Sequence, residues 1–475
     1  MPRVKNRQKT EFGDFQTPID LARDVCARLA QDGISPASVL EPTCGKGTFL
    51  QAAAEFFPDR PRLIGREANP LYVATAQARF SATAAQVDMG QVDIREADFF
   101  QVDWPRLLAQ LPQPLLVLGN PPWVTNSQLG TFEGTNLPAK SNFLNETGLD
   151  ARTGKANFDI SQWMIERLID NLVGTQATLA MLCKTAVARK VLRHIWKRSL
   201  PAGRSSIRQI DARRHFGAAV DACLFTWTFS VDAMPECEVF VDLQSEKPSH
   251  FLGWHEGSLL ANQAAFRRHQ HLRASNRTTR WRSGIKHDCR AVMQLRRDGS
   301  KLLNGLGEIV IIEPEYLFPL LPAGAIFRGE VDRTDRFLIV PQTHTGEDTT
   351  QLRKTATGTW AYLSSHATRL AARKSSIYRG RPPFSIFGVG PYSFAPWKVA
   401  ISALHKQLAF RLIGPLEGRP VMFDDTTYFL SFENQREAQA AVDRLNSAEV
   451  REFYSAWIFW DAKRPITAEI LQRLS

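Results

Sequence analysis

The amino-acid sequence predicts an α/β protein in which a doubly wound, mostly parallel, Rossmann-like sheet precedes a C-terminal α+β domain. Short apolar runs alternate with amphipathic, helix-like segments up to about residue 200, which is typical of consecutive strand–helix–strand units. At 475 residues with 44% hydrophobic side chains, the chain is long enough for two or three domains with real cores. We expect a first domain over residues 1–245 and a second over residues 246–475.

The first predicted elements lead to a glycine-rich turn. Thr17-Pro18 suits the N-cap and first position of a helix that runs through Leu29. A strand then ends in Glu41-Pro42-Thr43-Cys44-Gly45-Lys46-Gly47, whose glycines let the main chain approach a ligand before the next helix begins. The turn has a carboxylate but neither a third glycine nor a Lys-Ser/Thr pair. It therefore fits a cationic or zwitterionic ligand better than a pyrophosphate.

Two further predicted strands end in acidic residues. The strand from Arg62 ends at Glu67, which is placed to bind the two hydroxyl groups of a ribose. The next strand leads to Asp98, which can accept a hydrogen bond from an adenine amino group while Phe99 packs against the ring. Taken singly, each acid could also be an ordinary solvated loop residue. Ligands bind outside the carboxyl ends of strands in open α/β sheets, however, so these strand ends are expected to share one crevice.

The fourth strand end carries the most informative motif. The apolar run 115–119 stops abruptly at Asn120-Pro121-Pro122-Trp123. The two prolines lack N–H donors, fix their own φ and bias Asn120 towards an extended conformation. The carbonyls of Asn120 and Pro121 then lie next to the Asn120 amide and the Trp123 ring. Such a site suits a flat heterocycle with an exocyclic NH2 group, although a strand followed by Asn-Pro-Pro is often only a turn.

Taken together, these motifs resemble those of the gamma-class amino-methylating DNA methyltransferases, which use S-adenosylmethionine and often belong to restriction–modification systems. The resemblance covers roughly residues 10–235, and its order of motifs begins with Phe15-Gln16-Thr17-Pro18. It departs at Trp123, where the family has Tyr or Phe more often. The cofactor-binding residues that the resemblance implies are Phe15, Thr17, Pro18, Glu41, Pro42, Thr43, Cys44, Gly45, Gly47, Glu67, Ala68, Asp98, Phe99, Asn120 and Phe158.

The resemblance also implies a mechanism. Asn120, Pro121, Pro122 and Trp123 would form the catalytic turn, and an extruded base would stack between Trp123 and Phe216. Adenine N6 is expected as the methyl acceptor, because the family usually begins this turn with Asn for adenine and with Ser for cytosine N4. Alternatives are methylation of cytosine N4, of RNA or of a protein glutamine, a non-catalytic DNA-binding protein, and an enzyme that also cleaves DNA.

The basic residues concentrate in the second half of the chain. Residues 1–240 contain 27 basic and 25 acidic side chains, whereas residues 241–475 contain 32 and 23. From residue 349 to residue 416 there are ten basic residues and no acid. An acid-free stretch of that length favours contact with a polyanion over an ordinary solvated surface. We expect this half to bind double-stranded DNA, through residues that include Arg280, Arg282, Lys286, Arg373, Lys374, Arg379 and Arg381.

Other bulk features narrow the class of protein. The six cysteines are scattered without a Cys-x-x-Cys pair, which indicates reduced thiols and no metal site. No apolar run approaches 18 residues and no signal pattern is found, so a cytoplasmic protein without a membrane segment is expected. The acids of the second half form no persuasive nuclease cluster. We therefore expect a monomeric modification enzyme whose cognate restriction endonuclease acts as a separate protein.

Overall fold

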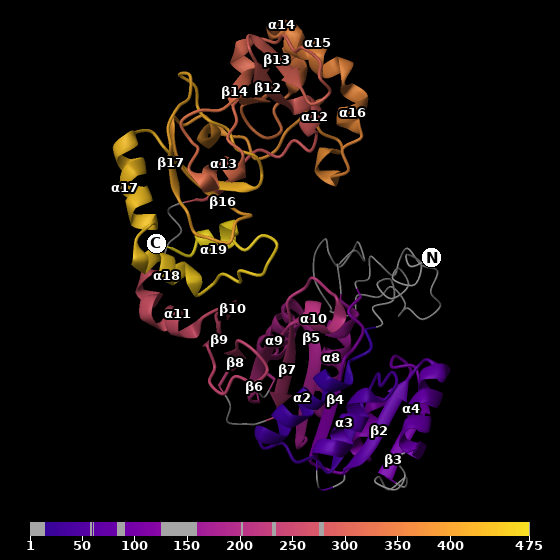
Figure 1. Cartoon of the computed structure of the whole chain (residues 1–475). Coiled ribbons are helices and arrows are strands. Elements are labelled where there is room, and N and C mark those ends of the chain that lie inside the picture. The colour runs from indigo at the N-terminus through magenta and orange to yellow at the C-terminus, as the bar shows by residue number, and fades with distance from the viewer. Residues whose placement is uncertain are drawn as a thin grey trace. The chain divides into compact units, whose positions relative to one another are not determined.

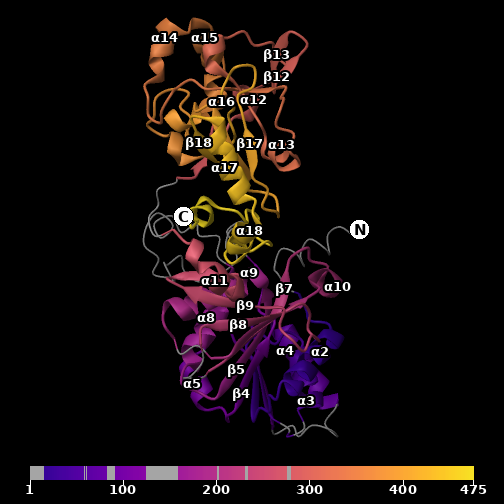
Figure 2. The same cartoon turned by 90° about the vertical axis from the view of Figure 1, so that its left-hand side faces the viewer.

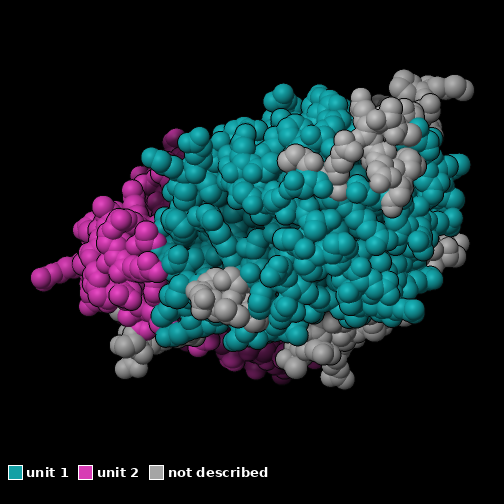
Figure 3. All heavy atoms as spheres, turned by 90° about the horizontal axis from the view of Figure 1, so that it is seen from below, with its two compact units in different colours: residues 1–263 teal, residues 264–475 magenta. Residues whose placement is uncertain are grey.

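The computed structural model describes residues 15–57, 59, 61–82, 91–124, 159–200, 203–229, 234–274 and 280–474. The chain divides into two compact units, residues 1–263 and residues 264–475, coloured teal and magenta in Figure 3. The division comes later than the expected boundary after residue 245. The reason is that the segment after residue 245 adds two more strands to the sheet of unit 1.

Unit 1 alternates strands and helices, as the sequence predicts. The first helix among the described residues begins at Ile19, with Pro18 at the N-cap position and no side-chain cap. Its elements are α2 (Ile19–Gln31), β1 (Ser38–Glu41), α3 (Thr48–Phe56), β2 (Arg62–Glu67), α4 (Pro70–Ala82), β3 (Val92–Glu96), α5 (Trp104–Ala109), β4 (Leu115–Gly119), α8 (Ile160–Leu172), β5 (Ala177–Lys184), α9 (Thr185–Lys197), β6 (Ser205–Ile210), α10 (Ala212–Phe216), β7 (Ala222–Thr228), β8 (Glu236–Phe240), β9 (His250–His255) and β10 (Ser258–Leu260).

These strands form one sheet in the order β10-β9-β8-β6-β7-β5-β4-β1-β2-β3. Strands β3, β2, β1, β4 and β5 run parallel to one another, whereas β7 is antiparallel to both β5 and β6. The winding direction changes between β1 and β4, where Leu40 pairs with both Ile64 and Val117. The prediction of a doubly wound, mostly parallel sheet is confirmed, and this switch point puts the ends of β1 and β4 side by side.

Helices cover both faces of the sheet (Figures 1 and 2). In Figure 2, α2, α3 and α4 lie on one side of the strands and α5 and α8 lie on the other. Every residue of β1 and of β4 is buried, as expected for parallel strands that are covered on both faces. This explains why the two strands read as continuous apolar runs.

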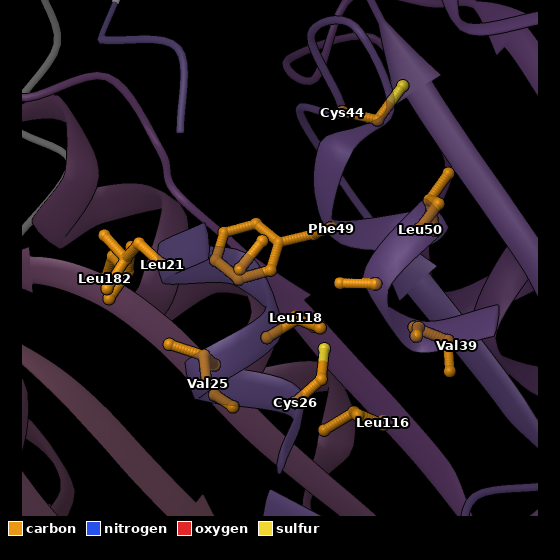
Figure 4. Packing of buried hydrophobic residues seen from close by; sticks show 14 of the residues in the cluster. Leu21, Val25, Cys26, Val39, Cys44, Phe49, Leu50, Leu116, Leu118 and Leu182 are labelled. Carbon is orange, nitrogen blue, oxygen red and sulfur yellow. The ribbon is translucent and has the colours of Figure 1, made fainter. Parts of the chain in front are cut away.

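The core under the glycine-rich turn is built around Phe49 of α3 (Figure 4). Its ring points towards Leu21 of α2 and Leu182 of β5, and all three side chains are almost fully buried. Burial of one such aromatic ring contributes roughly 1.5–3 kcal/mol, and truncation to alanine costs about 3–5 kcal/mol. Phe49 thus anchors the first turn of α3 against the centre of the sheet.

Unit 2 is α+β, in agreement with the prediction. It contains two antiparallel four-stranded sheets, ordered β11-β18-β16-β17 and β13-β12-β15-β14, with short helices between and around them. Its elements after α11 (Gln263–His269) are η2 (Gln270–Leu272), β11 (Arg282–Ser283), α12 (Arg290–Met293), β12 (Gln294–Asp298), β13 (Lys301–Asn304), η3 (Pro314–Tyr316), β14 (Leu317–Pro319), α13 (Ala323–Arg328), β15 (Arg336–Ile339), η4 (Thr349–Gln351), α14 (Leu352–Thr355), α15 (Thr357–Ser365), α16 (Ala367–Ala371), η5 (Ser376–Tyr378), η6 (Pro391–Ser393), β16 (Trp397–Ser402), β17 (Arg411–Ile413), β18 (Thr427–Phe432), α17 (Gln435–Leu445), α18 (Ala448–Ser455) and α19 (Ala468–Leu471).

Among the helices that the structure describes, none combines the length and the apolar character that a bilayer crossing would require.

Candidate functional site

The glycine-rich turn between β1 and α3 has the backbone that its sequence predicts. Gly45 and Gly47 both adopt positive φ, at 48° and 73°. A Cβ atom on Gly45 would lie 2.8 Å from Gln16 Oε1, and one on Gly47 would lie 3.1 Å from the Cβ of Ala76. The positive φ therefore opposes a side chain at both positions, and the Ala76 methyl group adds a steric limit at Gly47.

The rest of this turn packs inwards. Pro42 and Cys44 are buried and Thr43 is half-buried. The Cys44 thiol lies against β2, since a Cβ atom on Gly65 would come within 2.9 Å of its sulfur. Burial raises the pKa of this thiol, so it stays protonated at neutral pH. Its main-chain N–H donates to the Arg66 carbonyl at 2.8 Å and its carbonyl accepts from the Gly47 N–H at 2.7 Å, so Cys44 shapes the turn and packs in the core.

Glu67, at the end of β2, joins the first two strand ends. Its carboxylate accepts hydrogen bonds from the main-chain N–H of Gly45 and from that of Asn69, both at 2.8 Å. Ala68 follows as an exposed residue. The acid therefore lies at the mouth of the glycine-rich turn, where it is available to polar hydroxyl groups of a ligand.

Glu41, at the end of β1, is a buried acid with an unsatisfied oxygen. Only 4% of the residue is exposed, and its Oε2 atom has no hydrogen-bond partner. Burial raises the pKa of this carboxyl well above its usual range, and the main-chain N–H of Leu50 only partly opposes the rise. A buried carboxylate oxygen without a partner is the kind of group that an incoming cation stabilises.

Asp98 and Phe99 follow β3. The Asp98 carboxylate accepts from the N–H of Phe100 at 3.0 Å and from the Gln101 amide at 3.1 Å. The Phe99 ring is buried, with its centroid 4.7 Å from that of Trp104. Phe100 is the more exposed of the two phenylalanine rings. A ligand at this strand end would thus meet Phe100 more readily than Phe99.

Asn120 is held by the segment that precedes α2. Its Nδ2 atom donates to the Phe15 carbonyl at 3.0 Å and to Thr17 Oγ1 at 3.3 Å. Because a main-chain carbonyl can only accept, the amide nitrogen has to face Phe15, and Oδ1 is turned the other way. Asn120 Oδ1 is buried and has no hydrogen-bond partner. The Thr17 hydroxyl serves this amide and does not cap α2.

The rest of the turn is anchored in the sheet. Pro121 is buried, Pro122 is half-buried and Trp123 is only 5% exposed. The Trp123 indole N–H donates to the Leu182 carbonyl at 3.3 Å, and the Trp123 carbonyl accepts from Lys184 Nζ at 3.1 Å. Both partners lie on the neighbouring strand β5.

Three aromatic rings meet beside this turn. The Trp123 and Phe216 rings lie edge to face, with centroids 5.2 Å apart and an interplanar angle of 70°, and Phe15 contacts both. The expected pair of stacking rings is thus brought together, but the rings touch each other. A base could enter between Trp123 and Phe216 only after they separate. Phe158, also expected here, lies outside the described residues.

The same edge of the sheet is hollowed beside α10. Strand β6 runs parallel to β5, because both are antiparallel to β7, so its carboxyl end lies at the edge that carries Asn120. A hollow of about 610 Å³ opens there and is lined by residues 209–213 and 218–221. The carboxyl edge of the sheet therefore contains open space close in sequence to Phe216.

In unit 2, some of the expected DNA-binding residues are engaged inside the protein. The Arg373 guanidinium donates to the carbonyls of Leu370, His287 and Ser385 and stacks over Tyr378 at 3.7 Å. Arg282 lies over the Tyr392 ring at 4.4 Å. These arginines build the fold of unit 2, which net charge in the sequence could not reveal.

Other basic residues of unit 2 are exposed, although the Arg381 guanidinium also lies 5.9 Å from the centre of the Phe387 ring. Arg280, Lys374, Arg379 and Arg381 are exposed, and the last three lie within residues 374–381, on either side of η5. Lys286 is half-buried, with its Nζ 3.6 Å from Asp288. The structure thus brings Lys374, Arg379 and Arg381 onto one exposed segment.

Sequence reasoning missed one ion pair at the site. Lys184, the last residue of β5, donates to Asp159 Oδ2 at 2.7 Å as well as to the Trp123 carbonyl. The only sequence signal for this ion pair was Lys184 itself, a charged residue directly after the apolar run of β5. Within the described part of the chain, no three His, Cys, Asp or Glu side chains gather where they could hold a metal ion.

Two known proteins whose sequences are similar to this chain are both described as Type II methyltransferases. No protein-family model matches the chain. The Type II methyltransferase M.NspV of a Nostoc species is 45% identical over 476 residues, which cover 99% of this chain and 98% of that protein. The Type II methyltransferase M.XamI of Xanthomonas campestris pv. amaranthicola is 29% identical over 169 residues, 32% of this chain and 30% of its own length.

One solved structure is similar over nearly the whole chain. It is the Type IIL restriction–modification enzyme MmeI in complex with DNA, with a TM-score of 0.55 at 11% identity. The match covers 99% of this chain and 66% of that one. At this identity the likeness concerns the fold alone.

Proposed function

This chain belongs to the Type II DNA methyltransferases of restriction–modification systems, which use S-adenosylmethionine, and we propose that it methylates the exocyclic N6 of adenine in double-stranded DNA. The observation that carries the proposal is the unpartnered, buried Oδ1 atom of Asn120, at the end of β4. A buried acceptor without a donor costs about 1–3 kcal/mol, so the site is built for a donor that arrives with the substrate. An exocyclic amino group is such a donor.

The chemistry of the turn follows from its acceptors. Asn120 Oδ1 and the Pro121 carbonyl would accept hydrogen bonds from the two hydrogens of the amino group. Holding both hydrogens to one side draws the nitrogen towards a tetrahedral shape and frees its lone pair from the ring. The amino nitrogen can then attack directly, without a covalent enzyme intermediate. The rate gain would come chiefly from positioning, which in well-oriented systems is worth roughly 7–11 kcal/mol.

The residues at the other strand ends fit S-adenosylmethionine, which supplies an activated methyl group when bound. The unsatisfied Glu41 oxygen suits the cationic amino group of its methionine part. We propose that Glu67, at the end of β2, accepts from ribose hydroxyls and that Asp98, after β3, accepts from an adenine amino group; their positions at neighbouring strand ends support this. S-adenosylmethionine has no pyrophosphate, so the site needs no charged group to bind one.

The target base has to leave the DNA helix to reach Asn120. We propose that it is rotated out and stacks between Trp123 and Phe216 after these rings part. Stacking on an aromatic ring contributes about 1–3 kcal/mol per base, which offsets part of the lost stacking in the duplex. The exposed cations of unit 2 would contact the DNA backbone or base edges. We further propose that the enzyme acts as a monomer and that a separate endonuclease shares its recognition site.

The decisive experiment identifies the modified nucleoside. DNA methylated by the pure protein with tritiated cofactor is digested, and the labelled nucleosides are separated. We expect N6-methyladenine, with no label in DNA that was incubated with Asn120→Ala. Because the variant loses only one side chain at the catalytic turn, it should still bind DNA. Label in N4-methylcytosine alone would transfer the proposal to cytosine, and full activity of Asn120→Ala would overturn the assigned role of Asn120.

A further inference from the structure

The catalytic turn Asn120–Trp123 has no main-chain N–H donors at its two central residues. Its two prolines have no N–H groups, so the main chain between Asn120 and Trp123 cannot donate hydrogen bonds there. At its first residue, the turn is held through the Asn120 side chain by Phe15 and Thr17. At its last residue, it is held through two bonds of Trp123 to β5.

Lys184 provides the only charged contact among these bonds. Its ammonium donates to the Trp123 carbonyl at 3.1 Å and to Asp159 Oδ2 at 2.7 Å. The lysine side chain is 23% exposed and that of Asp159 is 6% exposed, so the pair is largely removed from water. Charge-assisted hydrogen bonds of this kind are roughly twice as strong as neutral ones.

The backbone of Lys184 is itself fixed. It is the last residue of β5 and pairs with Ala222 of β7, and the same strand pairs with β4 up to Gly119. The strand that carries the lysine is therefore bonded to the strand that leads into the turn. Because its backbone is fixed in the sheet, Lys184 can restrain the position of the Trp123 carbonyl.

Asp159 extends the connection to α8. It is the N-cap of that helix, where its carboxylate accepts from the N–H of Ser161 at 3.2 Å and from the Ser161 hydroxyl at 2.5 Å. In addition, the N–H of Ile160 donates to the carbonyl of Val124, directly after the turn, at 3.0 Å. The ammonium thus joins β5, the turn and the start of α8.

We propose that Lys184 is a positioning residue for methyl transfer, which fixes the Trp123 end of the turn and thereby keeps Asn120 Oδ1 and the Pro121 carbonyl aligned on the target amino group. The proposal rests on the proposed function of the turn. Lys184 touches neither the base nor the cofactor in this role. Its loss is expected to act on the rate, because misplacement of a reacting group by 1 Å can cost about 10²-fold.

A purely structural role predicts something different. If Lys184 served only to neutralise the buried Asp159, any change that removed both charges would restore both folding and activity. The double variant Lys184→Met/Asp159→Asn makes this distinction, since asparagine is still a good N-cap for α8 and leaves no unpaired buried charge. Lys197→Met, which removes an exposed lysine from α9, serves as the matched control.

The experiment compares wild type, Lys184→Met, the double variant and the control as full-length proteins. Melting temperature, the cofactor Kd by calorimetry and the single-turnover rate of tritium transfer to DNA are measured. We expect Lys184→Met to lose stability and about 10²-fold in rate. The double variant should regain the melting temperature and a cofactor Kd near that of wild type, while its rate stays low. The control should match wild type in all three measurements.

Recovery of the rate together with the melting temperature in the double variant would overturn the proposal, as would full activity of Lys184→Met. Lys184→Arg, which keeps a cationic donor, should recover part of the rate in a positioning role. Tritium is counted in any base, so a wild type that methylates cytosine still tests Lys184. A wild type that transfers no methyl group to DNA would instead refute the proposed function.

Discussion

The two units contain turns of the same pattern, a polar residue followed by two prolines and an aromatic residue. In unit 1 it is Asn120–Trp123, and in unit 2 it is Arg381–Phe384. Both aromatic side chains are buried. The polar residues differ, because the Asn120 amide is held at the end of a sheet whereas Arg381 is exposed. The prolines therefore stiffen both turns, and the preceding segment decides which group is presented.

What precedes each turn explains the contrast. Asn120 follows a fully buried strand, so its side chain emerges where several strand ends meet. Arg381 follows Gly380, at a φ of 66°, on a loop whose Phe384 has a φ of 61°. A bulky residue with positive φ is strained, and such strain persists only where the surroundings impose it. The second turn is thus a rigid support for an exposed guanidinium.

Replacing Glu41, the buried acid beside the first turn, should distinguish the functions of the two turns most clearly. Glu41 lies next to the strand that leads to Asn120, since a Cβ atom on Gly119 would be 3.6 Å from its Cγ. Glu41→Gln is expected to weaken cofactor binding by roughly 10–100-fold, the worth of a hydrogen bond to a charged group. DNA binding, which we assign to the second turn and its surroundings, should be unchanged. Calorimetry with the cofactor and gel shifts with DNA test both parts, and Glu55→Gln at an exposed ion pair is the control.

The raised pKa of Glu41 gives this prediction a pH dependence. The carboxylate is lost as the pH falls through the raised pKa, so cofactor affinity should decline at a higher pH than for an ordinary glutamate. Without cofactor, stability is greatest below the pKa of the unfolded chain and is lost as the pH rises through the folded-state value. Ligand-free Glu41→Gln should therefore melt above wild type in mildly alkaline buffer. Equal melting at every pH would contradict the burial argument.

Arg381→Ala should have a smaller effect, confined to DNA binding. Loss of one base or phosphate contact costs about 1–3 kcal/mol, so DNA affinity should fall by roughly tenfold at a constant cofactor Kd. A loss limited to the recognition sequence indicates a base contact, whereas a uniform loss with a shallower salt dependence indicates a phosphate contact. Arg436→Ala, on the exposed face of α17, is the matched control. Unchanged affinity for every DNA sequence would remove Arg381 from the interface.

The smallest effect on rate is expected from Trp123→Phe. The ring is retained, but the hydrogen bond to the Leu182 carbonyl is lost, and an unpaired buried carbonyl costs about 1–3 kcal/mol of stability. The methylation rate should fall only a few-fold, because the Lys184 contact to the main chain of residue 123 remains. Phe384→Leu in the second turn should likewise lower the melting temperature without a change in rate. A collapse of the rate in Trp123→Phe would assign the indole N–H a larger role.

The strand ends of unit 1 were predictable because each couples a local pattern to a general rule. Glu67 and Asn120 end apolar runs, and parallel strands bring such ends to one edge. The contacts between them were not predictable. Lys184 and Asp159 lie 25 residues apart, and their pairing depends on how β4 and β5 align. Phe15 and Thr17 were expected to bind the cofactor, but their hydrogen bonds with the Asn120 amide were not expected.

The second unit marks a different limit of sequence reasoning. Arg373 and Arg381 contribute equally to a charge count, yet the first is occupied by three carbonyls and the second faces solvent. Charge is a property of composition, whereas availability depends on packing. The strands β8–β10 were missed for a related reason: β10 is short, and only two of the six residues of β9 are buried, so its apolar pattern is weak.

The bonds from the Asn120 amide to the Phe15 carbonyl and to Thr17 tie residues 15–17, directly ahead of α2, to the proposed catalytic turn. A force or a ligand that shifted residues 15–17 would rotate the amide without entering the crevice.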